Sequence, residues 1–184
     1  YKVFGPHMAA LFGRTERWAE FEGPNHFFLP ADVYKFELGG PSHEGCAGLL
    51  ALGEYLQFLS GSHELRRADI ERAWSVMSSF EVPLQRRLID FLDSKTGITI
   101  VGPKTSGPER VCTISFLSSK LRPDEICEAT RKAGIGIRYG HMYAYRMCVA
   151  CGIDTELGVT RISMAHYNSP EEVEKLIEVL DPII

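Results

Sequence analysis

The chain has 184 residues, which is the length of one domain or slightly more. Hydrophobic residues make up 45% of it and charged residues 24%, a balance that excludes disorder of the whole chain. The net charge of −4 does not favour nucleic acid as a partner, because binders of phosphate backbones usually carry an excess of bases. No apolar run approaches the roughly 20 residues of a membrane span, so we expect no membrane partner.

The start of the chain and its cysteines bear on where the protein works. The sequence begins at Tyr1 without an initiator Met and without a basic and apolar leader, so we expect a piece of a longer protein and no secretory signal. Its cysteines are odd in number and scattered: Cys46, Cys112, Cys127, Cys148 and Cys151. This usage is typical of reduced thiols and predicts a cytoplasmic protein.

The first third of the chain is rich in loops. The apolar run at residues 8–12 predicts a buried strand, and the Gly- and Pro-rich stretch at 14–45 leaves room only for short strands such as 34–37. Residues 46–59 are apolar almost all round a helix, which predicts a buried helix. We expect Gly61 to end this helix.

A longer helix is predicted at residues 64–92, because its apolar positions recur in steps of three and four. Pro83 interrupts the pattern and should kink the helix or split it in two. The basic pairs at 66–67 and 86–87 have acidic neighbours, so we interpret them as part of a solvated face.

The last third alternates strands and helices, as in an α/β unit. Short apolar or alternating runs predict strands at residues 98–101, 111–117, 135–139 and 159–164. A helix at 123–133 should end at Gly134, and the final helix has Ser169 as N-cap, Pro170 at its first position and Glu172 to complete a capping box. We therefore expect an α/β fold, a small sheet flanked by helices, without internal repeats.

Arg161 is the first candidate for a binding residue. No acid occurs between Ala129 and Ile153 or between Leu157 and Pro170, and Arg161 lies mid-strand in the second of these windows. A guanidinium group in such a place needs an anionic partner, because its charge cannot be neutralised. Spacing alone leaves two alternatives, an internal salt bridge and a clamp for the carboxylate of a substrate.

Two other patterns are weaker. The turn at residues 39–42 precedes a helix and can present backbone N–H groups to an anion. Cys148 and Cys151 form a single CxxC pair, which cannot complete a tetrahedral metal site, so we expect no metal.

Several segments occur in the order found in a known family. Residues 1–12 (a Lys, then Gly-Pro, then a strand of small residues), 37–44, 135–141, 159–163 and 167–169 resemble motifs of the class V aminotransferase group of fold-type I, pyridoxal-phosphate enzymes, and in particular its cysteine desulfurase-like branch. The resemblance implies the end of the large cofactor-binding domain at 1–60 and a C-terminal small α/β domain at 61–184. It also implies an enzyme that acts on an amino acid and forms a homodimer.

The resemblance also implies roles for individual residues. Lys2 would be the catalytic lysine that forms a Schiff base with pyridoxal 5′-phosphate. Gly40 and Ser42 would approach the phosphate of that cofactor near the homodimer interface. Arg161 would bind the α-carboxylate of the substrate, which agrees with the second alternative above.

Arg138, His141 and Tyr143 complete the expected substrate-binding residues. Tyr143 stands where one desulfurase branch has the cysteine that accepts sulfur, and a phenol cannot carry a persulfide. Two alternatives therefore remain beside the amino-acid enzyme: a binding module that keeps the fold without the chemistry, and a sulfur transferase that uses Cys148 or Cys151.

Overall fold

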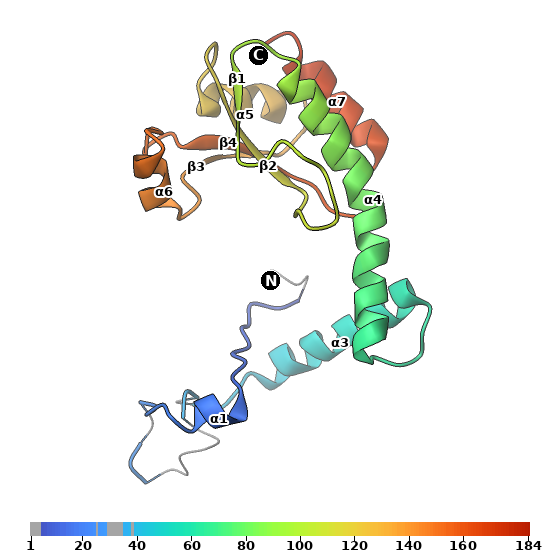
Figure 1. Ribbon diagram of the computed structural model, residues 1–184, viewed down its shortest axis with the longest axis vertical. Helices are drawn as coiled ribbons and strands as arrows, with labels where there is room; N and C mark the ends of the chain where they lie inside the picture. Colours follow the sequence, from blue (N-terminus) through green and yellow to red (C-terminus); the bar gives the residue numbers. More distant parts are fainter. Residues whose placement is uncertain (1–4, 25, 29–34, 38) are drawn as a thin grey trace. The chain divides into compact units, whose positions relative to one another are not determined.

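The computed structural model describes residues 5–24, 26–28, 35–37 and 39–184 of the chain (Figure 1). Two compact units are present, Tyr1–Ala73 and Trp74–Ile184. Helix α4 (Arg67–Asp93) contains the boundary between them. The assignment of 1–60 and 61–184 to a large and a small domain stays a prediction.

The first unit contains the short helix α1 (Thr15–Trp18) and the helix α3 (His43–Ser60). Gly61 ends α3 in the left-handed conformation (φ 67°), as predicted. The prediction of a strand at residues 8–12 is wrong, because these residues form no strand. Of the strand expected at 34–37, residues 35–37 are not extended in a sheet and Tyr34 lies outside the described residues.

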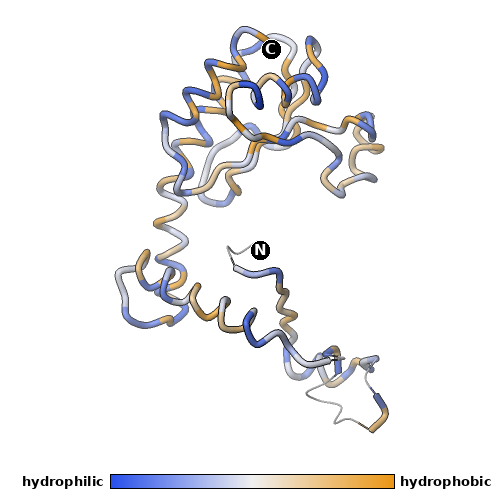
Figure 2. Tube along the Cα trace, turned by 180° about the vertical axis from the view of Figure 1, so that it is seen from behind, coloured by the Kyte–Doolittle hydropathy of each residue, from blue (hydrophilic) through white to orange (hydrophobic). Residues whose placement is uncertain are grey.

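Helix α3 is not the buried helix that its composition predicts. Leu50 and Phe58 expose 79% and 78% of their surface, and Figure 2 shows the apolar character that runs along this helix. One side does have a cover: a Cβ on Gly48 would lie 3.2 Å from the ring of Pro6, so this glycine lets the segment before α1 approach the helix. Only part of the apolar surface of α3 is therefore covered by other residues of this unit.

Helix α4 runs without a break through Pro83. Of the two effects predicted for Pro83, the split is therefore wrong and the kink stays a prediction, since proline removes one backbone donor from the helix. Three of the four arginines of the basic pairs form ion pairs with exposed acids, as expected for a solvated face: Arg66 with Glu64 (2.7 Å), Arg67 with Glu71 (2.7 Å) and Arg87 with Glu174 (2.5 Å).

The second unit contains a four-stranded antiparallel sheet in the order β1-β2-β4-β3. The strands are β1 (Ile98–Val101), β2 (Thr113–Ser118), β3 (Arg138–Gly140) and β4 (Val159–Ser163). Three of them lie close to the predicted ranges. The strand expected at 135–139 begins three residues later, since the Ile135 N–H donates to the Thr130 carbonyl (2.9 Å) at the end of the preceding helix.

Helices α5 (Pro123–Lys132) and α7 (Pro170–Leu180) join α4 in a layer against one face of the sheet, and the short α6 (Tyr145–Ala150) follows β3 (Figure 1). The predicted capping box of α7 is confirmed: Ser169 Oγ accepts from the Glu172 N–H, and Glu172 Oε2 accepts from the Ser169 N–H. Among the helices that the structure describes, none combines the length and the apolar character needed to cross a bilayer.

The main core lies between this helical layer and the sheet. It contains Leu88 of α4, Phe116 of β2, Ile162 of β4 and Leu180 of α7, all 2% exposed or less. Because side chains alternate along a strand, burial of Ile162 on this face directs Arg161 to the opposite face. The core thus fixes which way the first candidate binding residue points.

Candidate functional site

Arg161 and Arg138 face each other across two neighbouring strands. In the β3–β4 register Arg138 lies directly opposite Arg161, so both side chains emerge on the sheet face without the helical layer. On the other side of β4, the Met164 N–H donates to the Cys112 carbonyl (2.8 Å). The backbone N–H and C=O groups of successive residues in a strand point to opposite neighbours, so those of Arg161, three residues before Met164, point toward β3. Arg138 and Arg161 are therefore a hydrogen-bonded pair in the β3–β4 ladder.

This pair of cations has no counter-ion among the residues that the structure describes. Neither guanidinium group forms an ion pair with any acid in the described part of the chain, and Arg161 Nε is buried without a hydrogen-bond acceptor. Like charges directly opposite each other destabilise a sheet, and a buried donor without an acceptor costs free energy. The geometry therefore removes the internal salt bridge as an alternative for Arg161 among the described residues and leaves the other alternative, a clamp for a carboxylate, as a prediction.

The loop after β3 carries the two other predicted residues. Met142 and Tyr143 both have positive φ angles, 51° and 64°, although neither is glycine. Such a conformation is uncommon for side chains of this size and often accompanies functional loops. It leaves the Tyr143 side chain fully exposed at the tip of the loop.

His141 is held by this loop in one orientation. The Tyr143 N–H donates to His141 Nδ1 (3.1 Å), and the rings of Tyr143 and Tyr145 both meet the imidazole edge to face. Because Nδ1 accepts this hydrogen bond, the proton of the neutral imidazole resides on Nε2. His141 therefore presents a donor at its other nitrogen.

Arg138, His141 and Tyr143 line one open groove of about 1070 Å³. The groove runs along residues 135–143 and past α5, whose Asp124, Cys127, Glu128 and Arg131 also line it, and it includes Glu156. The acids of α5 already have partners: Asp124 pairs with Arg122 (2.6 Å) and Glu128 with Arg131 (2.7 Å). Within the described part of the chain, Arg138 is thus the one lysine or arginine of this lining without an ion pair.

Two neighbours of this site were not predicted from the sequence. Ser115 of β2 lies directly opposite Arg161 on its other side, and Cys127 of α5 lies close enough for Arg138 to act on its thiol. Burial raises the pKa of Cys127 and Asp124 raises it further, while Arg138 opposes both. The folded structure places Ser115 and Cys127 beside the two arginines, and no residue spacing in the sequence predicts this proximity.

The start of α3 has the form of an anion site. Ser42 is the N-cap: its Oγ accepts from the Gly45 N–H (3.0 Å), and its carbonyl accepts from the Cys46 N–H (2.9 Å). The backbone N–H groups of His43 and Glu44 are then the donors of the first turn that can face an anion. A Cβ placed on Gly40 would meet no atom within 4 Å, so this glycine keeps the approach open. Glu44 in the same turn contributes an opposing negative charge.

The predicted residues therefore fall into three groups. Arg138, His141, Tyr143 and Arg161 belong to the second unit, and the register and the groove relate them to one another. Gly40 and Ser42 belong to the first unit. Lys2 lies outside the described residues, so its role stays a prediction.

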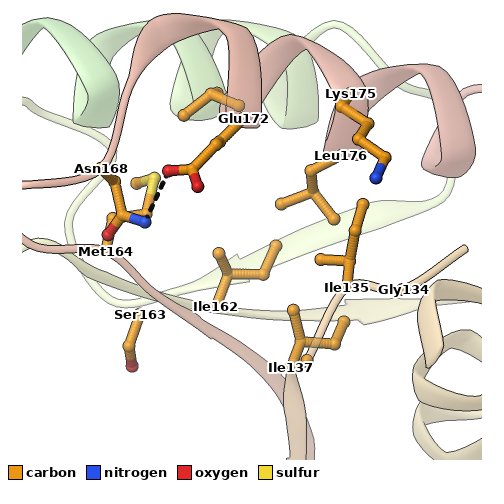
Figure 3. A pocket seen from close by; sticks show the side chains of 12 residues that line it. Gly134, Ile135, Ile137, Ile162, Ser163, Met164, Asn168, Glu172, Lys175 and Leu176 are labelled. Carbon is orange, nitrogen blue, oxygen red and sulfur yellow. Dashed lines mark hydrogen bonds between the residues drawn. The ribbon is translucent and has the colours of Figure 1, made fainter.

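A smaller cavity of about 270 Å³ lies between residues 134–137, the end of β4 and α7 (Figure 3). Ile137, Ile162 and Leu176 form its apolar floor. The Asn168 amide donates to Glu172 Oε2 (2.8 Å), the same oxygen that caps α7. The polar groups at this end of the cavity thus serve the start of the helix.

The cysteines offer little reactive chemistry. All five are free, Cys148 is buried in α6, and burial raises the pKa of Cys112 to about 12. Cys46 and Cys151 are exposed. Among the described residues no group of three acidic, histidine or cysteine side chains could hold a metal ion.

Comparison with known proteins identifies the family. The model of the family Aminotransferase class-V matches residues 26–176, which is most of the chain. The chain belongs to this family. Members of the family use pyridoxal 5′-phosphate and act on amino acids, and they are usually dimeric.

Curated relatives agree with this membership. The aminotransferase-like protein FGM3 of Gibberella zeae is 32% identical over 188 residues, which cover all of this chain and 44% of FGM3. A probable cysteine desulfurase of Streptomyces coelicolor is 28% identical and matches 85% of this chain and 33% of its own length. The chain therefore spans less than half of the length of these relatives.

Solved structures show the same fold. The apo cysteine desulfurase of Thermococcus onnurineus superposes with a TM-score of 0.71 at 25% identity, covering 93% of this chain and 41% of that protein. The cysteine desulfurase CsdA of Escherichia coli gives 0.62 at 22% identity, covering 83% and 33%. The expectation of a fold-type I α/β architecture is confirmed.

Proposed function

We propose that this chain is part of a pyridoxal-phosphate-dependent enzyme that binds an amino acid through Arg161. The observation that carries the proposal is the pair of arginines on the open face of the sheet, which lacks an acidic partner in the described residues. An amino-acid substrate provides the missing carboxylate. The planar guanidinium group can bind both of its oxygens, which a lysine ammonium group cannot do.

The described residues fit the phosphate of the cofactor. The first turn of α3 offers the backbone N–H groups of His43 and Glu44, and the space beside Gly40 is open. The Ser42 hydroxyl donates to Glu44 Oε2 (3.5 Å), a long hydrogen bond that a phosphate oxygen would replace. Lys2 is the proposed covalent attachment point for the cofactor. When bound, pyridoxal phosphate supplies an electron sink for negative charge on the α-carbon of the substrate.

The residues of the second unit orient the substrate. Arg161 holds the α-carboxylate against the sheet, and His141 presents its Nε2–H toward the groove as a hydrogen-bond donor. The phenol of Tyr143 lies fully exposed at the tip of the loop. A phenol accepts no sulfur atom, so we place this protein with the enzymes that do not pass a persulfide through this loop.

Two further parts of the proposal concern the whole protein. A homodimer is supported by the apolar side chains that α3 leaves exposed, Leu50 and Phe58, because exposed apolar surface of this kind favours association. A cytoplasmic, reducing location is supported by the five free cysteines. Sedimentation of the cofactor-loaded protein tests the first part, and a tightly loaded monomer would contradict it.

The decisive experiment is chemical mapping of the cofactor. Protein expressed with pyridoxal phosphate should be yellow, with an absorbance band at the edge of the visible range from a lysine-bound pyridoxal. Borohydride should bleach this band, and peptide mapping should find the pyridoxyl group on Lys2. Lys2→Ala should lose the band and keep the circular dichroism of the fold. A colourless protein would favour the binding module, and a pyridoxyl group on another lysine would refute the assignment of Lys2.

The binding of the substrate is tested separately. Arg161→Lys should weaken amino-acid binding by about 30-fold or more, the usual cost of losing one buried charge-assisted pair. The colour of the cofactor should survive this change, because Arg161 does not hold the phosphate. Unchanged amino-acid affinity in Arg161→Lys would contradict the clamp.

A further inference from the structure

The second arginine of the pair requires an anion of its own. Arg138 lies directly opposite Arg161, forms no ion pair in the described part of the chain, and is exposed in the large groove. One carboxylate placed between the two guanidinium groups balances one of their charges and leaves the other unbalanced. The phosphate of the cofactor, in the proposal above, is assigned to the start of α3 and not to this sheet.

The other charged groups around the groove do not supply this anion. Asp124 and Glu128 are occupied by Arg122 and Arg131, and Glu156 lines the same groove without an ion pair to Arg138. The Cys127 thiol near Arg138 has a raised pKa, so it stays neutral near pH 7. A cation that faces open space beside a second cation is well placed to bind a further negative charge on the ligand.

We propose that Arg138 binds a second acidic group on the substrate, so that the site selects an amino acid with an acidic side chain. This inference rests on the proposed function, because it takes Arg161 as the partner of the α-carboxylate. An acidic amino acid has two anionic groups joined by a short carbon chain, and the two guanidinium groups emerge side by side on one face. His141 Nε2–H is a further donor along the same groove.

The test compares ligands of the same shape that differ by one charge. Succinate and succinamate differ only in the replacement of one carboxylate by an amide. Calorimetry on the cofactor-loaded protein should show that succinate binds about 30-fold more tightly or better, the usual effect of one charge-assisted pair. L-Aspartate and L-asparagine should show the same order when they perturb the absorbance of the cofactor.

Variants then locate the selecting residue. Arg138→Gln should remove the preference for succinate and change the affinity for succinamate by less than about threefold, a difference too small for a lost charged contact. Arg131→Gln is the matched control: it removes a cation from the same groove, but one that already pairs with Glu128 (2.7 Å), and should keep the preference. Arg138→Lys keeps the charge and should retain part of the preference.

Three outcomes would overturn the inference. Equal affinity for succinate and succinamate would show that no second carboxylate is bound. Equal losses for both ligands in Arg138→Gln would show that the two arginines share one carboxylate. An intact preference in that variant, with unchanged circular dichroism, would place the selecting residue elsewhere.

Failure of the proposed function gives a different result. A protein without cofactor colour that still prefers succinate, and loses this preference in Arg138→Gln, would keep the two-carboxylate site and refute the enzyme. A coloured protein with a pyridoxyl group on Lys2 but without the preference would keep the enzyme and refute the selectivity.

Discussion

The two units of the chain use their hydrophobic residues in opposite ways. Apart from Ala73, every buried hydrophobic residue of the described chain belongs to Trp74–Ile184. Both units expose large apolar side chains, but those of the first unit have no buried core beneath them among the described residues: Leu11, Phe12, Phe21, Phe27, Phe28, Phe36, Leu50, Phe58 and Leu65. Apolar surface stabilises a fold only where something covers it. The second unit therefore contains its own core, whereas the described residues of the first unit leave most of their large apolar side chains uncovered.

The strongest test of this comparison is a pair of leucine truncations. Leu88→Ala in the core of the second unit should lower the free energy of unfolding by about 2–5 kcal/mol, because it removes fully buried methyl groups and leaves a cavity. Leu50→Ala in α3 should change it by less than about 0.5 kcal/mol in the monomeric chain, as at other exposed positions, and by more only where a second copy covers this leucine. Urea unfolding followed by circular dichroism measures both, and similar losses would show that α3 is covered in solution.

A pair of glutamines sharpens the contrast for polar groups. Gln85 is 1% exposed, donates to the Arg110 carbonyl (3.1 Å) and accepts from the Gly107 N–H (3.4 Å). Gln85→Leu leaves both backbone groups unpaired inside the protein and should cost about 1–3 kcal/mol. Gln57, which donates to the His63 carbonyl in the first unit (2.7 Å), is the matched control.

Gln57→Leu should be nearly neutral, because water can replace its exposed hydrogen bond. Chemical denaturation of both variants gives the two free energies. A neutral Gln85→Leu would mean that the turn at 107–110 reaches water and is not held by this side chain.

The two helix caps test the same contrast on a smaller scale. Ser169→Ala removes half of the capping box of α7, a helix whose apolar side is in the core, and should cost about 1 kcal/mol of global stability. Ser42→Ala removes the cap of α3 and should lower helix content without shifting the main unfolding transition. Hydrogen exchange of the two first turns distinguishes local fraying from global loss, and equal global shifts would contradict the difference between the units.

The smallest effect concerns thiols. Burial raises the pKa of Cys112 to about 12, so this thiol should resist alkylation at pH 8, whereas the exposed Cys46 and Cys151 should react. A raised folded-state pKa stabilises the protein below the ordinary thiol pKa. This contribution is lost as the pH rises from about 9 toward 12. Mass spectrometry of alkylated peptides measures the order of reaction, and rapid labelling of Cys112 would refute its burial.

Local signals were sufficient for the second unit. The start of α7 at Ser169, the end of α5 before Gly134 and the strand at 159–164 were all predicted closely, because a capping box, a left-handed glycine and alternation are local properties. The strand predicted at 135–139 begins later than expected, because the Ile135 N–H donates to the Thr130 carbonyl at the end of α5. The exposure of α3 could not be predicted, because composition shows that a helix is apolar but does not show which residues, if any, cover it.

The sequence by itself determined that Arg161 stands in a strand without acids nearby, and the family motifs determined its expected role. It could not decide between a salt bridge and a ligand site, because ion pairs join residues that are far apart in the chain. The tertiary structure removes the salt bridge among the described residues, because it places Arg138 opposite Arg161 and pairs Asp124 and Glu128 of α5 with other residues. The ligand site stays a proposal. Strand register is a property of the assembled sheet, so only the folded chain could bring the two cations to one face.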